Sequence, residues 1–164
     1  MVYVTHDQAE ALSMADRIVV LHAGRVLQVG PPRGVYLAPA TPLVARQLGA
    51  PPINLFEVHC DGERWFAREG TPLCAAPGEA VGGGLLGVRP EHAQLADQGA
   101  WTLTVEVIEM LGAERLVYGH VGGALFTLRI EGTLTPPSVG SQVRIDAPAA
   151  RIHWFDAASG KRVG

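Results

Sequence analysis

The sequence predicts a mainly β protein, α+β overall, in which a helix–hairpin–helix segment precedes a β-rich domain. Ala50-Pro51-Pro52 is the clearest boundary, because the pattern changes there from helix and hairpin to short strands. Clusters of Gly, Pro and Asp separate the later strand-like runs, which is typical of a small barrel or sandwich. We therefore expect two parts, residues 1–50 and residues 51–164.

The first part is expected to contain three helices and a hairpin. Asp7 is a suitable N-cap residue, and Glu10 follows at the spacing of a capping box. Residues 17–22 and 25–30 flank the turn signal Ala23-Gly24 and predict a β-hairpin. Short helices over 33–37 and 42–48 follow, and the second ends at Gly49.

The second part is expected to form a compact OB-like β-barrel of about 110 residues. The sequence does not determine the order of its strands. The expected strands span 53–60, 63–68, 85–89, 101–111, 114–121, 124–130, 142–147 and 151–155.

The composition excludes several classes of function. A net charge of −3 with scattered basic residues argues against binding to nucleic acid. No apolar run approaches the roughly 20 residues of a membrane-spanning helix, and no secretion signal is evident, so we expect a cytoplasmic protein. Cys60 and Cys74 lack C-x-x-C spacing, which favours two free thiols over a disulfide. The six histidines show no ligand spacing, so no metal site is expected.

His6 is the first candidate for chemistry, because it stands between a strand-like run and a capped helix. An imidazole placed there can reach a terminal phosphate and position an attacking water. The alternative is a histidine that simply precedes a helix, and the spacing alone favours this alternative.

A succession of motifs along the chain resembles one family. THDQAEA at 5–11, ADRIVVL at 15–21, GRV at 24–26 and QVGPP at 28–32 closely resemble the end of an ATP-binding-cassette (ABC) ATPase domain. VYLAP at 35–39 and GAPPIN at 49–54 resemble importers of the maltose, glycerol-phosphate, polyamine and iron type. GVRPEH at 87–92 and IHWFDAASG at 152–160 resemble the C-terminal regulatory domain of these importers, the TOBE domain.

The resemblance implies that His6 is the switch histidine that contacts the γ-phosphate of ATP in an intact subunit, which also uses Mg²⁺. The phosphate-binding loop G-x-x-x-x-G-K-[ST] has no match in the sequence. The family's signature motif, its Mg²⁺-binding Asp and its catalytic Glu are also unmatched. We therefore expect the C-terminal portion of a longer subunit, with no ATPase activity and no cofactor of its own.

The resemblance also implies partners. It predicts a homodimer formed through the β domain, membrane subunits of a transporter, and a place at the inner face of the membrane. The transported solute, a sugar, polyamine or similar small molecule, cannot be deduced from this chain. The candidate dimer or regulatory contacts are Arg89, Glu91, His92, Gly112 and Glu114.

These candidates have structural alternatives. Arg89 and His92 could contact an anion or a second subunit, or Pro90 could simply end a strand with Glu91 turned outward. Gly112 could approach a partner, but a hairpin connection with an unusual backbone angle is favoured. A different function, a small oxyanion-binding barrel of the molybdate type, also remains open.

One structural consequence concerns residues 2–49. In the family that the motifs resemble, this segment packs against the rest of an ATPase domain, so Leu12, Val19, Val20 and Leu27 are expected to lie uncovered in this chain. Apolar surface of that kind usually finds a partner. We expect the segment to fold back on the β domain or to pack against a second copy of the chain.

Overall fold

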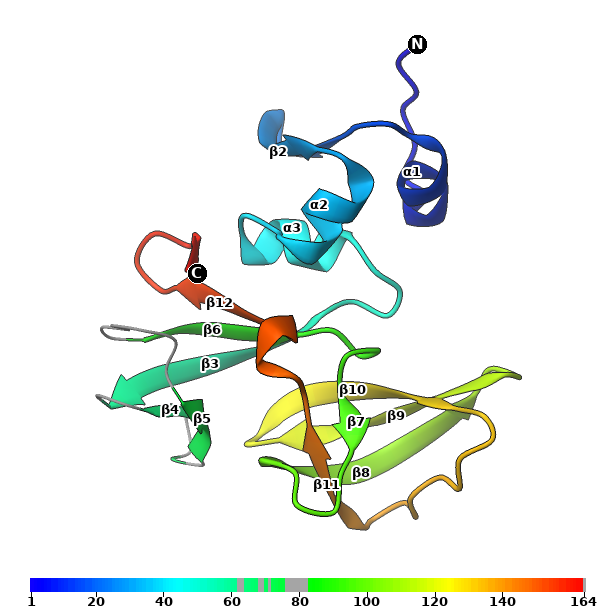
Figure 1. Ribbon diagram of the computed structural model, residues 1–164, viewed down its shortest axis with the longest axis vertical. Coiled ribbons are helices and arrows are strands. Elements are labelled where there is room, and N and C mark those ends of the chain that lie inside the picture. The colour runs from blue at the N-terminus through cyan, green and yellow to red at the C-terminus, as the bar shows by residue number, and fades with distance from the viewer. Residues whose placement is uncertain (62–63, 68–69, 71, 76–82, 164) are drawn as a thin grey trace.

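The first part of the chain forms helices around one β-hairpin (Figure 1). The computed structural model describes residues 1–61, 64–67, 70, 72–75 and 83–163. The elements of the N-terminal segment, residues 1–50, are α1 (Gln8–Met14), β1 (Ile18–His22), β2 (Arg25–Gly30), α2 (Pro32–Leu37) and α3 (Pro42–Gln47). The predicted hairpin is confirmed, since β1 and β2 pair antiparallel. Ala23 and Gly24 both have positive φ, at 48° and 76°, as tight hairpin turns require.

The start of α1 differs in one detail from the predicted capping box. The Asp7 carboxylate accepts hydrogen bonds from the backbone amides of Ala9 at 2.8 Å and Glu10 at 3.1 Å, as expected of an N-cap. The Asp7 amide, however, donates to the Thr5 hydroxyl at 2.9 Å. Glu10 therefore does not reach back to that amide, and it accepts instead from the hydroxyls of Tyr3 and Thr5.

The second part, the β domain, consists of two antiparallel sheets, which confirms the mainly β, OB-like class. One sheet has the order β13-β12-β6-β3-β4-β5. Its strands are β3 (Asn54–Asp61), β4 (Arg64–Ala67), β5 (Pro72–Ala75), β6 (Gly83–Val88), β12 (Ile152–Asp156) and β13 (Arg162–Val163). The other sheet has the order β10-β9-β8-β11-β7. Its strands are β7 (Gln94–Leu95), β8 (Trp101–Met110), β9 (Glu114–Val121), β10 (Ala124–Glu131) and β11 (Gln142–Asp146), and the 3-10 turn η1 (Ala149–Arg151) leads into β12.

The eight predicted strands are present, with ends shifted by a few residues. The sequence missed β5, β7 and β13, which contain four, two and two residues. Such short strands exist because a neighbouring strand offers hydrogen bonds, so their own sequences carry little alternation. Within the described ranges, no helix has the length and apolar character to cross a lipid bilayer.

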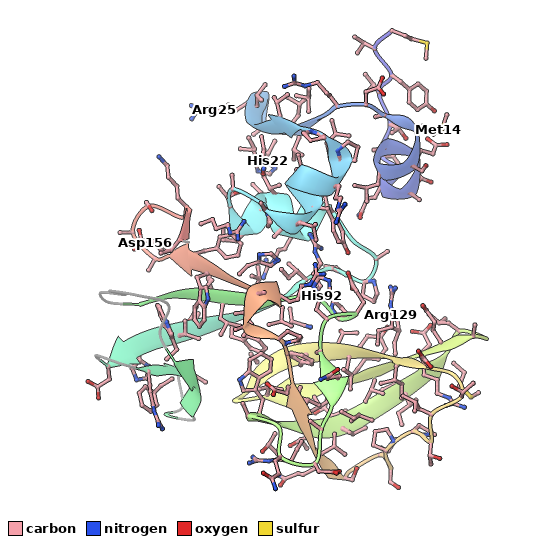
Figure 2. All side chains as sticks on the ribbon, viewed as in Figure 1. Met14, His22, Arg25, His92, Arg129 and Asp156 are labelled. Carbon is pink, nitrogen blue, oxygen red and sulfur yellow. The ribbon has the colours of Figure 1, made fainter. Side chains whose placement is uncertain are left out.

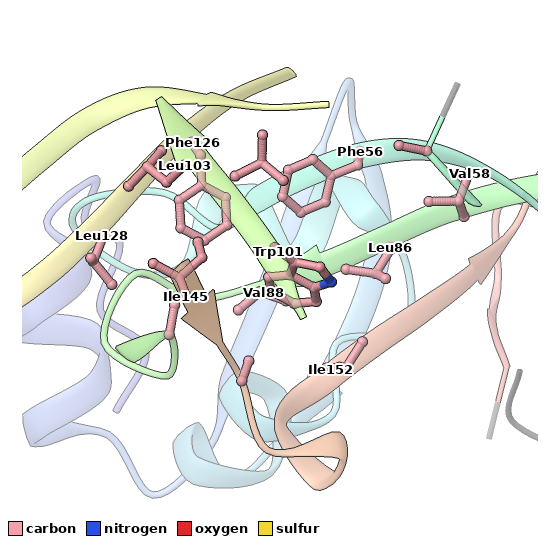
Figure 3. Close-up of a cluster of buried hydrophobic side chains, with 14 of the residues drawn as sticks. Phe56, Val58, Leu86, Val88, Trp101, Leu103, Phe126, Leu128, Ile145 and Ile152 are labelled. Atoms are coloured by element: carbon pink, nitrogen blue, oxygen red, sulfur yellow. The ribbon is translucent and has the colours of Figure 1, made fainter. Parts of the chain in front are cut away.

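The main core lies between the two sheets (Figure 3). Phe56 of β3 stacks on Phe126 of β10, with ring centroids 5.5 Å apart, and Trp101 of β8 packs against both rings. Leu86 and Leu103 are fully buried beside them. Side chains from both sheets thus share one apolar interior, which stabilises the barrel as a unit.

Asn54 joins the two sheets at their edges. Its side-chain amide donates to the Thr127 carbonyl at 2.8 Å, and its side-chain oxygen accepts from the Thr127 amide at 2.7 Å. Asn54 therefore pairs with β10 as a peptide group of a neighbouring strand would. This side chain satisfies edge groups of β10 that would otherwise be available to another chain.

The N-terminal segment packs on the β domain, so the first of the two predicted arrangements is confirmed. Ala45 of α3, Ile53 and Phe155 of β12 form one buried apolar cluster across the junction. The segment also has a small cluster of its own, in which Ile18, Val20, Val35, Val44 and Leu48 are buried and Leu12 and Leu27 are partly buried. The expectation of uncovered apolar residues holds for Val19, which is 53% exposed, and is wrong for Val20.

The side chains of Cys60 and Cys74 lie outside the described residues, so the prediction of free thiols stays a prediction. The backbone places the two cysteines on β3 and β5, each opposite Trp65 of the intervening strand β4. The Cα atoms of Cys60 and Cys74 are therefore two strand spacings apart, about 9.5 Å. That separation exceeds the usual Cα distance across a disulfide.

Candidate functional site

Arg89 is buried where the N-terminal segment meets the β domain (Figure 2 shows the neighbouring His92 and Arg129). Strand β6 pairs up to Val88, and Pro90 follows, so the predicted end of pairing is confirmed. The Arg89 guanidinium donates to the carbonyls of Leu48 at 2.5 Å and Tyr36 at 3.0 Å. It also lies 3.6 Å from the centroid of the Tyr36 ring. Burial lowers the pKa of Arg89, and the carbonyls and the ring offset the loss of water around its charge.

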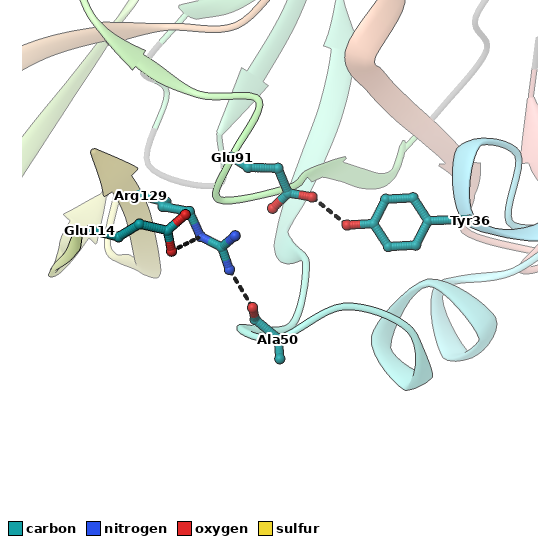
Figure 4. A network of polar contacts seen from close by, with 5 residues as sticks. All are labelled: Tyr36, Ala50, Glu91, Glu114 and Arg129. Atoms are coloured by element: carbon teal, nitrogen blue, oxygen red, sulfur yellow. Dashed lines mark hydrogen bonds and ion pairs between the residues drawn. The ribbon is translucent and has the colours of Figure 1, made fainter. Parts of the chain in front are cut away.

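Glu91 faces the N-terminal segment. Its carboxylate accepts a hydrogen bond from the Tyr36 hydroxyl (Figure 4). Burial, and then this bond, raise the pKa of Tyr36 to about 12. Of the two alternatives left open, the one in which Glu91 turns outward is not what the structure shows, because the Tyr36 phenol on α2 offers it a donor.

Arg129 forms a second link across the junction. Its guanidinium donates to the Ala50 carbonyl, and its Nε lies 3.6 Å from the Glu114 carboxylate (Figure 4). Its backbone amide donates to the Pro90 carbonyl at 3.1 Å. Arg89, Glu91 and Glu114, three of the predicted site residues, thus surround the junction. Sequence reasoning missed Tyr36 and Arg129, and no local signal marks them, because their partners lie far away in the sequence.

Gly112 lies in the turn between β8 and β9. Its φ is +73°, and the Leu111 amide donates to the Glu114 carbonyl at 2.9 Å, so the predicted hairpin connection is confirmed. Among the described residues, no atom lies within 4 Å of the position that a Cβ would occupy. Gly112 is exposed at the end of the hairpin.

His92 and His153 are buried near several positive groups. His153 on β12 is 3% exposed, and neither ring nitrogen has a hydrogen-bond partner among the described residues. Burial first, and then the charge of Arg162, lowers the pKa of His153 to about 4. Burial also lowers the pKa of the partly buried His92. Burial therefore favours the neutral form of both imidazoles. Sequence reasoning did not single out His153.

His6 is exposed on the bend that precedes α1 and is not part of the Arg89 cluster. The two sites are connected through Gln8, whose side-chain oxygen accepts from the Gly49 amide at 2.6 Å. Gly49 follows Leu48, whose carbonyl binds Arg89. In the part of the chain that is described, no three His, Cys, Asp or Glu side chains come together as metal ligands would.

The chain is similar in sequence to known proteins. Residues 86–155, from β6 to β12, match the TOBE domain. The chain is 40% identical to the sn-glycerol-3-phosphate import ATP-binding protein UgpC of Chromobacterium violaceum, over 98% of the chain and 45% of that protein. It is 37% identical to the UgpC protein of Cupriavidus metallidurans and 36% identical to that of a Jannaschia species, again over 98% of the chain and over 47% and 46% of those proteins. The chain spans about half the length of the curated relatives it matches.

The resemblance to ABC importer ATPase subunits is therefore confirmed. The match to the TOBE domain covers residues 86–155 of the β domain and agrees with the mainly β, OB-like class. The similarity to import ATP-binding proteins extends across both parts of the chain.

Proposed function

We propose that this chain is the C-terminal regulatory and dimerisation portion of the ATP-hydrolysing subunit of an ABC importer for a small solute. In the intact subunit, His6 would contact the γ-phosphate of ATP, and Mg²⁺ and the phosphate-binding loop would come from sequence that has no match here. Membrane subunits of the importer would be its partners, at the cytoplasmic face of the membrane. Nucleic acid is not expected to bind.

One observation carries this proposal: similarity to import ATP-binding proteins extends over 98% of the chain and includes both the His6 segment and the TOBE domain. An isolated oxyanion-binding barrel would need only the second part, so the comparison favours the importer. The named solute of the relatives, sn-glycerol-3-phosphate, makes that compound the first to test.

A hybrid subunit tests the proposal. The first half of the Chromobacterium violaceum relative, joined ahead of this chain, supplies the phosphate-binding half. With the relative's membrane subunits, the hybrid is expected to hydrolyse ATP, and His6→Ala is expected to lower kcat by at least about a hundredfold. A folded hybrid with activity that His6→Ala leaves unchanged would contradict the role of His6.

The proposed dimer surface lies at the β8–β9 hairpin, beside Gly112 and Glu114. Met110 and Leu111 expose 68% and 51% of their surface there, and Leu134, whose carbonyl accepts from Arg115, exposes 49%. Exposed apolar side chains at one place are a common feature of interfaces. Sedimentation equilibrium is expected to show a dimer that Met110→Glu dissociates. A wild-type chain that stays monomeric at high concentration would refute this surface.

A further inference from the structure

The junction peptide, Leu48-Gly49-Ala50, is held from two sides by consecutive backbone groups. On the side of the N-terminal segment, the Gly49 amide donates to the Gln8 side chain at 2.6 Å. On the side of the β domain, Arg89 donates to the Leu48 carbonyl at 2.5 Å and Arg129 donates to the Ala50 carbonyl. The same three residues therefore connect α1 to the β domain.

The backbone of Gly49 is constrained at this position. Its φ is +109°, in the region that favours glycine. A Cβ at this position would lie 2.7 Å from the Arg89 guanidinium and 3.5 Å from the Tyr36 hydroxyl. The Arg89 side chain thus occupies the space beside Gly49, in direct contact with the junction peptide.

Gln8 connects this peptide to the loop that carries His6. It is the first residue of α1, two positions after His6, and Asp7 between them caps the helix. The Asp7 amide donates to the Thr5 hydroxyl, and the Asp7 carboxylate accepts from the amides of Ala9 and Glu10, so hydrogen bonds hold the backbone on both sides of His6 and Gln8. Gln8 therefore lies between two held points, its backbone in the capped start of α1 next to His6 and its side chain on the Gly49 amide.

We propose that Gln8 is a positioning residue that couples the β domain to His6 through the Gly49 amide and Arg89. The inference rests on the proposed role of His6, and it assigns the route by which a signal received by the β domain changes the geometry of the nucleotide site. Physical coupling of this kind requires a continuous set of contacts between the two sites, and Arg89, Leu48, Gly49 and Gln8 supply one.

The first test is the hydrogen-exchange rate of the Gly49 amide in the chain itself, measured by NMR. Gln8→Leu removes the acceptor and is expected to speed exchange about tenfold, whereas Gln8→Glu keeps an acceptor oxygen and is expected to preserve protection. Gln28→Leu is the matched control, because Gln28 binds the backbone of Ala38 and Ala40 away from this peptide. Equal exchange of the Gly49 amide in Gln8→Leu and the Gln28→Leu control would overturn the proposal.

The second test measures the coupling. Arg89→Lys is expected to shift the amide resonances of residues 5–10, and Gln8→Leu is expected to abolish that shift. The proposal is refuted if Arg89→Lys leaves these resonances in place, or moves them equally in both backgrounds. Should Arg89→Lys fail to fold, Arg129→Lys acts on the same peptide through Ala50 and is read in the same way.

Neither measurement requires nucleotide, so their failure is distinct from failure of the proposed function. If the hybrid subunit hydrolyses ATP through His6 and the NMR coupling is absent, only the route through Gln8 is wrong. If the coupling is present and His6→Ala has no effect on hydrolysis, the proposed role of His6 is wrong.

Discussion

The two parts of the molecule differ in how they are stabilised. The β domain has one large core between two sheets, whereas the N-terminal segment buries a few aliphatic residues around α2 and α3 and shares another cluster with Phe155. Val19 and Val29 pair across the two strands of its hairpin and stay exposed, on the face opposite to the buried Ile18 and Val20. This difference indicates that the β domain folds by itself and that the segment depends on contacts at the junction.

The largest expected difference comes from a matched pair of leucine truncations. Leu103→Ala, in the main core, is expected to destabilise the chain by about 3–5 kcal/mol, and Leu48→Ala, in the small cluster, by about 2 kcal/mol. All three tryptophans lie in the β domain. In urea unfolding, tryptophan fluorescence should therefore show the loss of stability caused by Leu103→Ala. Circular dichroism of the helices should show the loss caused by Leu48→Ala. Equal shifts of both signals in both variants would show that the two parts unfold together.

Acid should weaken the β domain through His153. In the folded state its pKa is about 4, against about 6.5 when unfolded. The unfolded state therefore binds protons more readily at His153 than the folded state does. The contribution of His153 to the free energy of unfolding is complete above about pH 6.5. It is lost as the pH falls towards 4, by up to roughly 3 kcal/mol. Urea unfolding between pH 7 and 4 should show less loss for His153→Phe than for wild type. His22→Gln, at an exposed histidine, is the control and should leave the slope unchanged.

Asn54→Ala should remove the two hydrogen bonds that join β3 to β10 and leave the apolar core packing intact. The change leaves the amide and carbonyl of Thr127 without their partner, which costs about 1–3 kcal/mol. Thermal unfolding measures the loss, and exchange of the Thr127 amide locates it. The idea that Asn54 closes the barrel would be wrong if this amide remained as protected as in wild type.

The smallest effect is expected on the exposed face of the hairpin. Val19→Thr and Val29→Thr keep the side-chain shape and should change stability by less than about 0.5 kcal/mol. They should lower self-association at high concentration, because they remove exposed apolar surface. Light scattering of both variants and wild type measures this. Unchanged association would show that this face takes no part in it.

Sequence predicted the features that depend on local chemistry. The β1–β2 hairpin followed from Ala23-Gly24, whose positive φ angles suit the turn, and the end of β6 followed from Pro90. Motif order identified the family before any fold was known. The junction was not predictable, because Arg89 and Tyr36 are 53 residues apart and only the packed fold brings them together. For the same reason the sequence leaves the orientation of Glu91 open, since its donor, Tyr36, lies on α2.

The N-terminal segment, which carries His6, is expected to take its structure from its contacts with the β domain, and two-dimensional NMR of the separated parts tests this dependence most directly. Residues 51–164 alone are expected to give a dispersed spectrum that overlays on that of the whole chain. Residues 1–50 alone are expected to give the narrow dispersion of an unfolded peptide. A dispersed, native-like spectrum from residues 1–50 alone would contradict the account.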